Sequence, residues 1–148
     1  PDATTLGVGT SNPTNATGSS YVCYAWYTIP GYSALVSYTG NGNADGPFIY
    51  LGFRPALIWR KGIATASGDW RWQDTTTDTA NPDTGALYLQ YPNGYIDGSA
   101  QSDCDFLSNG IKIRTSNALS NQANQSYLIM AWAENPFGGS NVAPANAR

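Results

Sequence analysis

SYTGNGNADGPFIYLGFRP, the stretch Ser37–Pro55, carries the strongest fold signal in the sequence. Its Asn41-Gly42 and Asp45-Gly46 dipeptides tolerate positive φ angles, so they predict a tight reversal of the chain. Pro47 suits the start of a strand, and the aromatic and β-branched run that follows at 48–53 has the length of a strand. The stretch therefore predicts a loop that leads directly into a core strand.

Further strand-length runs lie on both sides of this stretch, with turn residues between them. We expect strands at residues 5–9, 21–29, 32–38, 57–60, 69–74, 87–90 and 127–133, and a hairpin at 106–114. No segment has sustained helical periodicity, and strands at this spacing are typical of an antiparallel sandwich or barrel. At 148 residues, the chain has the length of one domain. The expected organisation is an extended segment over 1–20, an all-β sandwich over 21–137 and an extended tail over 138–148.

The charge and hydropathy of the chain argue against two classes of partner. The formal net charge is -3, and the seven basic residues are scattered along the sequence. No basic stripe is therefore available to neutralise a phosphate backbone, and nucleic acid is not an expected partner. No apolar run reaches the length that spans a bilayer, so membrane insertion is not expected either.

The two cysteines are expected to be free. Cys23 lies in the apolar run YVCYAW, where an unpaired cysteine behaves as a small buried hydrophobe. A bridge between Cys23 and Cys104 is the alternative, and the sequence alone cannot place their Cβ atoms within bridging distance.

An internal repeat links the two ends of the chain. The tripeptide TSN occurs at 10–12 and again at 115–117, and the pairs SY and AW and a proline recur at matching spacing in 20–30 and 126–136. The two sets of matches differ by one residue of slippage. We interpret the first thirty residues as the end of one unit and the rest as nearly a whole unit. Either the parent gene carries tandem copies or the fold places two equivalent hairpins side by side.

Three segments carry a family likeness. GYSALVSYTGNGNADGPFIYLGFRPALIW, DFLSNGIKIR and SYLIMAWAENPF, in that order, resemble a module of phage virion proteins, especially tail-fibre-like proteins. The module is similar to the laminin-G and concanavalin A type of jelly roll. The resemblance implies a jelly-roll sandwich on the virion surface. Our hypothesis for its assembly is a homo-oligomer together with other virion proteins.

The residue inventory argues against an enzyme. Histidine is absent, which removes a Ser-His-Asp triad, a Cys-His pair and a His-containing zinc site. Glu134 is the single glutamate, so the chain lacks the paired glutamates of a jelly-roll glycosidase. A pair of aspartates is the residual route to a carbohydrate-active enzyme. We expect a non-enzymatic protein.

Loop aspartates are the candidate metal ligands. No cofactor is expected, and calcium is the one ion to consider, with Asp45, Asp103 and Asp105 as its candidate ligands. Calcium takes six to eight oxygens, and the sequence has no loop with regularly spaced aspartates of the EF-hand kind. The alternative is that Asp45 accepts backbone hydrogen bonds within its own turn.

Aromatic residues are the candidate ligand-binding groups. Trp70 and Trp72 alternate with polar residues and are expected to share one inward face, and Trp26 and Trp132 are expected in the core. Exposure is expected instead for the three tyrosines around a Pro-Asn-Gly turn. With Asp45 they form the candidate binding surface, which comprises Tyr88, Tyr91, Tyr95 and Asp45.

Two functions compete on this evidence. The first is a virion structural module that attaches to host surface glycan through these loops. The second is a purely architectural subunit, for capsid decoration or fibre building, that assembles through its extended termini. An extended terminus can add a strand to the sheet edge of a partner.

Overall fold

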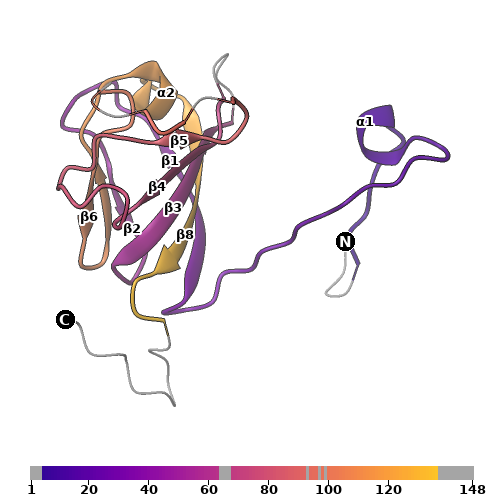
Figure 1. Cartoon of the computed structure of the whole chain (residues 1–148), viewed down its shortest axis with the longest axis horizontal. Coiled ribbons are helices and arrows are strands. Elements are labelled where there is room, and N and C mark those ends of the chain that lie inside the picture. Colours follow the sequence, from indigo (N-terminus) through magenta and orange to yellow (C-terminus); the bar gives the residue numbers. More distant parts are fainter. Residues whose placement is uncertain (1–4, 64–67, 93, 97, 99, 137–148) are drawn as a thin grey trace.

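Two antiparallel sheets face each other across one apolar core (Figure 1). The structure is a computed structural model that describes residues 5–63, 68–92, 94–96, 98 and 100–136. The larger sheet has the order β1 (Ser33–Thr39), β8 (Ser126–Ala133), β3 (Pro55–Gly62), β4 (Arg71–Asp74) and β5 (Leu87–Tyr88). The smaller sheet has the order β2 (Phe48–Tyr50), β7 (Gly110–Ile113) and β6 (Cys104–Leu107). The predicted all-β antiparallel sandwich is confirmed, and the jelly-roll connection stays a prediction.

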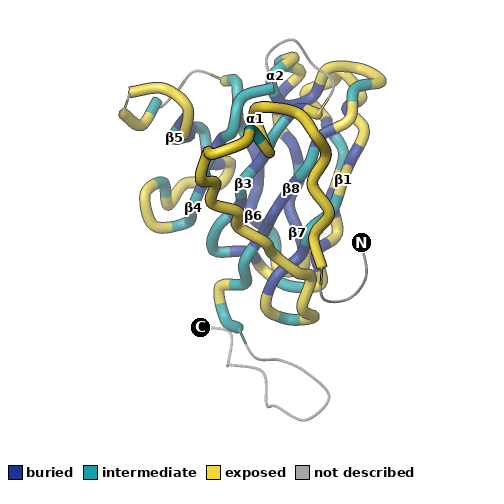
Figure 2. The backbone as a smooth tube through the Cα atoms, turned by 90° about the vertical axis from the view of Figure 1, so that its right-hand side faces the viewer, coloured by how far each residue is buried: buried dark blue, intermediate teal, exposed yellow. Residues whose placement is uncertain are grey.

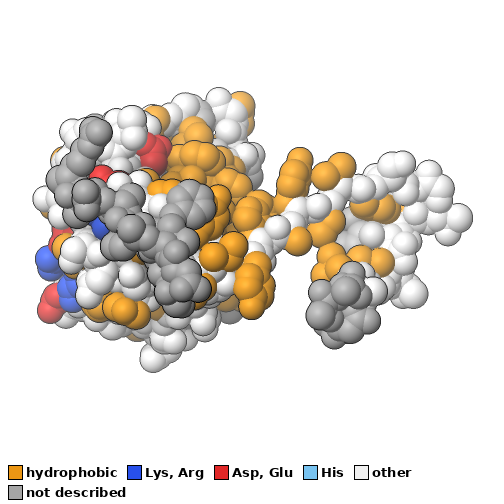
Figure 3. All heavy atoms as spheres, turned by 90° about the horizontal axis from the view of Figure 1, so that it is seen from below, with side chains coloured by type: hydrophobic (Ala, Val, Ile, Leu, Met, Phe, Trp, Pro, Cys, Tyr) orange, Lys and Arg blue, Asp and Glu red, His pale blue; other side chains and the backbone are white. Residues whose placement is uncertain are grey.

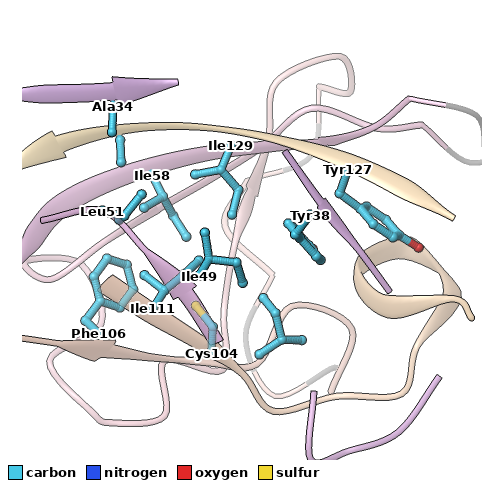
Figure 4. Packing of buried hydrophobic residues seen from close by; sticks show 12 residues of the cluster. Ala34, Tyr38, Ile49, Leu51, Ile58, Cys104, Phe106, Ile111, Tyr127 and Ile129 are labelled. Carbon is cyan, nitrogen blue, oxygen red and sulfur yellow. The ribbon is translucent and has the colours of Figure 1, made fainter. Parts of the chain in front are cut away.

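The core forms where the inner faces of the two sheets meet (Figure 4). Ile58 and Ile129 come from the larger sheet, and Ile49, Ile111 and Phe106 come from the smaller one. All five side chains are buried, as expected for β-branched and aromatic residues on the inner faces of a sandwich. This packing holds β3 and β8 in the middle of the larger sheet.

The opening stretch is built as predicted, with β1, a glycine- and asparagine-rich loop and β2. The short helix α2 (Ala118–Asn121) holds this loop in place. The Asn121 backbone carbonyl accepts from the Gly42 amide at 2.8 Å, and its side-chain oxygen accepts from the Asn41 amide at 2.8 Å. Gly42 has a φ of 68°, and a Cβ at Gly40 would lie 2.3 Å from the Gln122 carbonyl oxygen. The glycines are therefore required by the close approach of loop and helix.

Two predicted strands are absent. Residues 5–9 and 21–28 carry no strand, and apart from α1 (Asn12–Asn15) residues 5–28 run as an exposed arm (Figure 2) that extends away from the sandwich (Figure 1). Residues 5–28 are called the arm below. The strand expected at 21–29 is wrong because β8 occupies the place between β1 and β3, and no described strand pairs with the arm.

The positions of the arm and of β8 also test the expected domain boundaries and the interpretation of the internal repeat. Residues 21–28 lie outside the two sheets, although the sandwich was expected to begin at residue 21. The two repeated segments are not paired as neighbouring hairpins, because β8 is paired with β1 and β3. The tail expected over 138–148 lies outside the described residues.

Candidate functional site

An aromatic surface covers the outer side of the larger sheet. Trp59 of β3 contacts the neighbouring rings of Trp72 and Trp132, at centroid distances of 5.5 and 5.3 Å. Trp70 precedes β4, and the Lys61 ammonium lies 5.0 Å from the centroid of its ring. We call this surface the tryptophan face; its residues are Trp59, Trp70, Trp72, Trp132 and Met130. Figure 3 shows hydrophobic side chains gathered on the sandwich beside the base of the arm.

The tryptophan face reverses one prediction. Trp70 and Trp72 were expected to point inward, but on β4 it is Arg71 and Gln73 that are buried. Trp132 also lies on the outer side, although it was expected in the core. Period-2 alternation identifies which residues share a face, and it does not identify which face is inward.

A pocket opens on the tryptophan face. It has a volume of about 260 Å³, and its lining residues are Trp26, Trp59, Trp70, Leu89, Gln90 and Met130. The Gln90 side-chain oxygen accepts from the Trp70 amide at 3.0 Å, which holds the amide group at the rim. The pocket therefore combines indole walls with one polar group, a composition that suits an apolar ligand face with polar edges.

The arm contributes Trp26 to this pocket and is itself apolar. Trp26 meets Trp59 edge-on at a centroid distance of 5.5 Å and stacks on Tyr24 at 6.0 Å. It was expected in the core, yet it is 41% exposed. The arm also exposes Tyr21, Val22, Tyr24 and Tyr27. Both cysteines are free, as expected, but Cys23 is exposed, and the expectation of a buried Cys23 is therefore wrong for this chain.

The three tyrosines expected on the binding surface have different environments. Tyr88 of β5 is only 5% exposed, and its hydroxyl donates to the Gln101 side chain at 2.8 Å. Tyr91 and Tyr95 are exposed, as expected. Tyr95 lines a second hollow with Trp72, Asp74, Thr77 and Leu87. Tyr88 was therefore wrongly expected to be exposed, because β5 packs its ring into the sandwich near the Arg71 guanidinium.

The candidate calcium ligands are largely engaged by cations. Lys112 contacts the Asp45 carboxylate at 2.7 Å and holds the pKa of that carboxyl below its usual range. Arg114 binds Asp105 through two nitrogens at 2.6 Å. Burial raises the pKa of Asp103, whose Oδ1 has no hydrogen-bond partner. In the described part of the chain, no three His, Cys, Asp or Glu side chains gather in a group that could hold a metal ion.

The sequence alternative gave the Asp45 side chain an acceptor role in its own turn, but Asn41 and Asn43 take that role. The Asn43 side chain accepts from the Asp45 amide at 2.9 Å, and the Asn41 side chain accepts from the Asn43 amide at 3.0 Å and donates to the Asp45 carbonyl at 2.9 Å. Its carboxylate lies against β7 of the smaller sheet, whereas the three tyrosines belong to β5 and the residues after it. The structure therefore brings the rings of Tyr88 and Tyr91 together, with centroids 6.4 Å apart, but places Asp45 beside the other sheet.

Buried polar residues at one end of the sandwich escaped prediction. Arg60 and Arg71 are partners in the β3–β4 register and are fully buried. Arg60 donates to the side chain of Gln73 and to the carbonyl of Ser102, both at 2.9 Å. Burial and then repulsion from Arg60 lower the pKa of Arg71 to about 10. In the sequence, the one signal for this burial is alternation: Arg71 lies between Trp70 and Trp72 and therefore shares a face with Gln73.

Asp83 lies at this end of the sandwich and predicts a pH dependence. Burial raises the pKa of its carboxyl from 3.8 to about 6. The folded protein therefore holds this proton more tightly than the unfolded chain, and the stabilising contribution is present below pH 4 and is lost as the pH rises through 6. Asp83→Asn is expected to raise the free energy of unfolding at pH 8 by about 2 kcal/mol. Urea unfolding at several pH values measures this. A variant with unchanged pH dependence would contradict the assignment.

Within the described residues, no helix has both the length and the apolar character needed to cross a bilayer.

Comparisons with known proteins identify a family for this chain. Neither a curated protein nor a solved structure matches the chain. A family model described as a domain of unknown function, DUF7483, matches residues 1–136. The chain belongs to this family.

Proposed function

We propose that this member of the DUF7483 family is a non-enzymatic structural module that assembles with units of its own kind through the tryptophan face. The observation that carries the proposal is the apolar surface formed by that face and the base of the arm. Its proposed setting is the fibre or surface of a phage virion, as a homo-oligomer with other virion proteins. That setting rests on the sequence resemblance to phage tail-fibre modules.

The composition of the face supports an interface. Tryptophan is enriched in the centres of protein interfaces, and charged residues are depleted there. Two charged side chains lie at outward positions of β3 and β4, and both are engaged. Lys61 lies over the Trp70 ring, and Asp74 accepts from the Trp72 indole at 2.9 Å. A partner that covers this face would bury mainly indole surface, and the two charged groups beside it already have intramolecular contacts with tryptophan side chains.

The acidic groups support a non-enzymatic role. The carboxylate of Glu134, the single glutamate, is paired with Arg54 at 2.9 Å. The Asp74 carboxylate accepts from the amides of Thr76 and Thr77 and shapes the turn after β4. Both carboxylates are therefore engaged in local structure, whereas a glycosidase needs a carboxylic acid and a nucleophilic carboxylate available on either side of the scissile bond.

Self-association tests the proposal. Leu89 lines the pocket on the tryptophan face and is 44% exposed, so Leu89→Asp places a charge in the proposed interface without disturbing the core. We expect this variant to weaken self-association at least about tenfold, measured by analytical ultracentrifugation. Tyr50→Asp adds the same charge at an exposed position of the smaller sheet and is the matched control. A full chain that stays monomeric at high concentration would overturn the proposal.

Attachment to host surface glycan is the second candidate, and the indole-lined pocket is the observation that favours it. Aromatic rings stack on the apolar face of a sugar, and the Gln90 amide at the rim adds a polar group. Under this second candidate, the glycan contact is proposed at Trp59 and Trp70 instead of Tyr88 and Asp45. A glycan array probed with the full chain tests it. Binding that Trp70→Ala abolishes would support attachment, and an array without signal would contradict it.

A further inference from the structure

Residues 9–30 repeat the local structure of residues 115–136, the segment that contains α2 and β8. The Tyr127 hydroxyl donates to the carbonyl nine residues before it, at 2.6 Å, and accepts from the amide five residues before it, at 2.8 Å. The Tyr21 hydroxyl makes the same two bonds, at 2.5 and 2.9 Å. Each tyrosine thus ties its segment to both ends of a four-residue helix: the first helical residue and the residue after the last.

Other details of the two segments agree. The Asn121 side-chain amide donates to the carbonyl six residues before it, at 2.8 Å, and the Asn15 amide makes the same bond at the same distance. A residue with positive φ follows each helix at the same place, Gly18 at 78° and Asn124 at 62°. The repeat seen in the sequence is therefore a repeat of three-dimensional structure, and α1 is the counterpart of α2.

In the C-terminal segment, the repeated groups also bind the sandwich. The Ser120 hydroxyl accepts from Arg71 at 2.6 Å, and the Asn121 amide donates to the Asn41 side chain at 2.9 Å. The Tyr127 ring stacks on Tyr38 at a centroid distance of 5.0 Å. Farther along β8, Ala131 faces the core and Trp132 contacts Trp59.

The arm keeps the groups that make these contacts, although in this chain they lie outside the sandwich apart from the Trp26 contact with Trp59. The residues at the equivalent positions are Thr14, Asn15, Tyr21, Ala25 and Trp26. All five are exposed. At each of these positions the arm retains the group that the C-terminal segment uses there: a hydroxyl, an amide, a phenol, a small residue and an indole. An arm that only linked units or stayed in solvent would not require this set.

The alternation of inward and outward side chains along β8 also has a counterpart in the arm. The inward residues of β8 are Tyr127, Ile129 and Ala131, and their counterparts are Tyr21, Cys23 and Ala25. Cys23 thus occupies the position of a fully buried isoleucine. A small hydrophobic residue suits such a position, whereas an exposed thiol on an apolar arm has no evident use.

We propose that residues 9–30 are the closing segment of a second sandwich of the same kind, in which α1 replaces α2 and residues 20–27 fill the place of β8. The partner is the sandwich that precedes residue 9 in a chain of tandem units, each closed by the segment at the start of the next. This inference goes beyond the proposed function, because it names a partner for the arm and does not depend on self-association through the tryptophan face.

A preceding unit fits this role better than a second copy of the chain described here. In this chain, β8 already fills the place between β1 and β3, in continuous register with β1 over Ser33–Thr39 and with β3 from Leu57 to Gly62. An arm from another copy would have to displace it. A unit that lacks its own closing segment instead offers unpaired backbone groups on two strands, which an added strand satisfies.

A tandem protein tests this inference. Residues 31–114 are joined directly to Gly9 at the front of residues 9–148, so that residues 9–30 follow the first unit as 115–136 follow the second. The readout is the rate at which a thiol reagent labels Cys23, mapped by mass spectrometry. Cys104 is fully buried, and burial raises its thiol pKa to about 12, so it is an internal reference for protection. We expect labelling of Cys23 to be at least about 100-fold slower in the tandem than in the single chain.

Matched variants distinguish two ways in which Cys23 could be protected from the reagent: insertion of the arm as a closing strand, and nonspecific covering of the arm. Ala25→Asp puts a charge at the position of buried Ala131, and it is expected to restore fast labelling in the tandem while leaving the single chain unchanged. Ser20→Asp stands at the position of exposed Ser126 and is expected to have no effect in either protein.

A second tandem protein controls for misfolding of the first unit. Its first unit keeps its own residues 115–136, so residues 9–30 are superfluous and Cys23 is expected to stay reactive. If this reference folds and Cys23 in the first tandem still reacts at the single-chain rate, the inference is overturned, whether or not the first unit folds. Failure of the arm in this test leaves the Leu89→Asp result untouched, so the two proposals fail separately.

Discussion

Replacing Tyr127 by alanine is expected to lower the free energy of unfolding by about 4 kcal/mol. The ring is fully buried and stacks on Tyr38 at 5.0 Å, so the truncation leaves a cavity between β8 and β1. The hydroxyl bridges the carbonyl of Ala118 and the amide of Gln122, and both backbone groups lose their bond to it. Urea unfolding followed by tryptophan fluorescence measures the change.

Tyr21→Ala is the matched control for this prediction. Tyr21 makes the same two local hydrogen bonds, but its ring is 46% exposed and is not part of the core. Its replacement is expected to change the stability of the single chain by less than about 0.5 kcal/mol. Equal losses for the two variants would show that the local bonds, and not burial in the sandwich, supply the stability. In a tandem protein closed by the arm, the loss for Tyr21→Ala should approach that for Tyr127→Ala.

Arg71→Ala is expected to lower the free energy of unfolding by about 4 kcal/mol, although it removes a buried charge. The guanidinium donates to the Ser120 hydroxyl and the Leu119 carbonyl, which joins β4 to α2. Loss of these charge-assisted bonds and of a large buried side chain is worth about 7 kcal/mol. Relief of burial and of repulsion from Arg60 offsets about 3 kcal/mol, given a pKa lowered from 12.5 to about 10. The balance is destabilising.

Arg71→Met separates the terms in this balance. Methionine keeps most of the buried volume and removes the charge, so only the hydrogen bonds are lost. We expect this variant to unfold with a free energy within about 1.5 kcal/mol of the parent, as for other replacements of buried charges by apolar residues. If Arg71→Met is as destabilised as Arg71→Ala, the hydrogen bonds to α2 outweigh the packing. Denaturant unfolding of both variants under the same conditions decides.

The local signals in the sequence were sufficient for the β class and for most strands. The alternating and apolar runs identified β1, β3, β4, β8 and the β6–β7 hairpin, because side-chain period and turn chemistry are local properties. Asn41-Gly42 and Asp45-Gly46 marked the loop that the structure forms. The candidate site was predicted less well: Tyr91 and Tyr95 are exposed as expected, but Tyr88 is buried and Asp45 lies in a loop beside β7 of the other sheet.

By itself, the sequence determined that the chain forms antiparallel strands, that a glycine-rich loop precedes β2, and that residues 10–30 repeat the closing segment. Only the tertiary structure decided which face of an alternating strand is buried, because period-2 alternation is symmetric and the contacts of Arg71 with α2 turn Trp72 outward. It also decided that residues 126–133 form a strand while the similar residues 20–27 do not. A strand exists only where neighbours accept its hydrogen bonds, and β1 and β3 supply them to one copy alone.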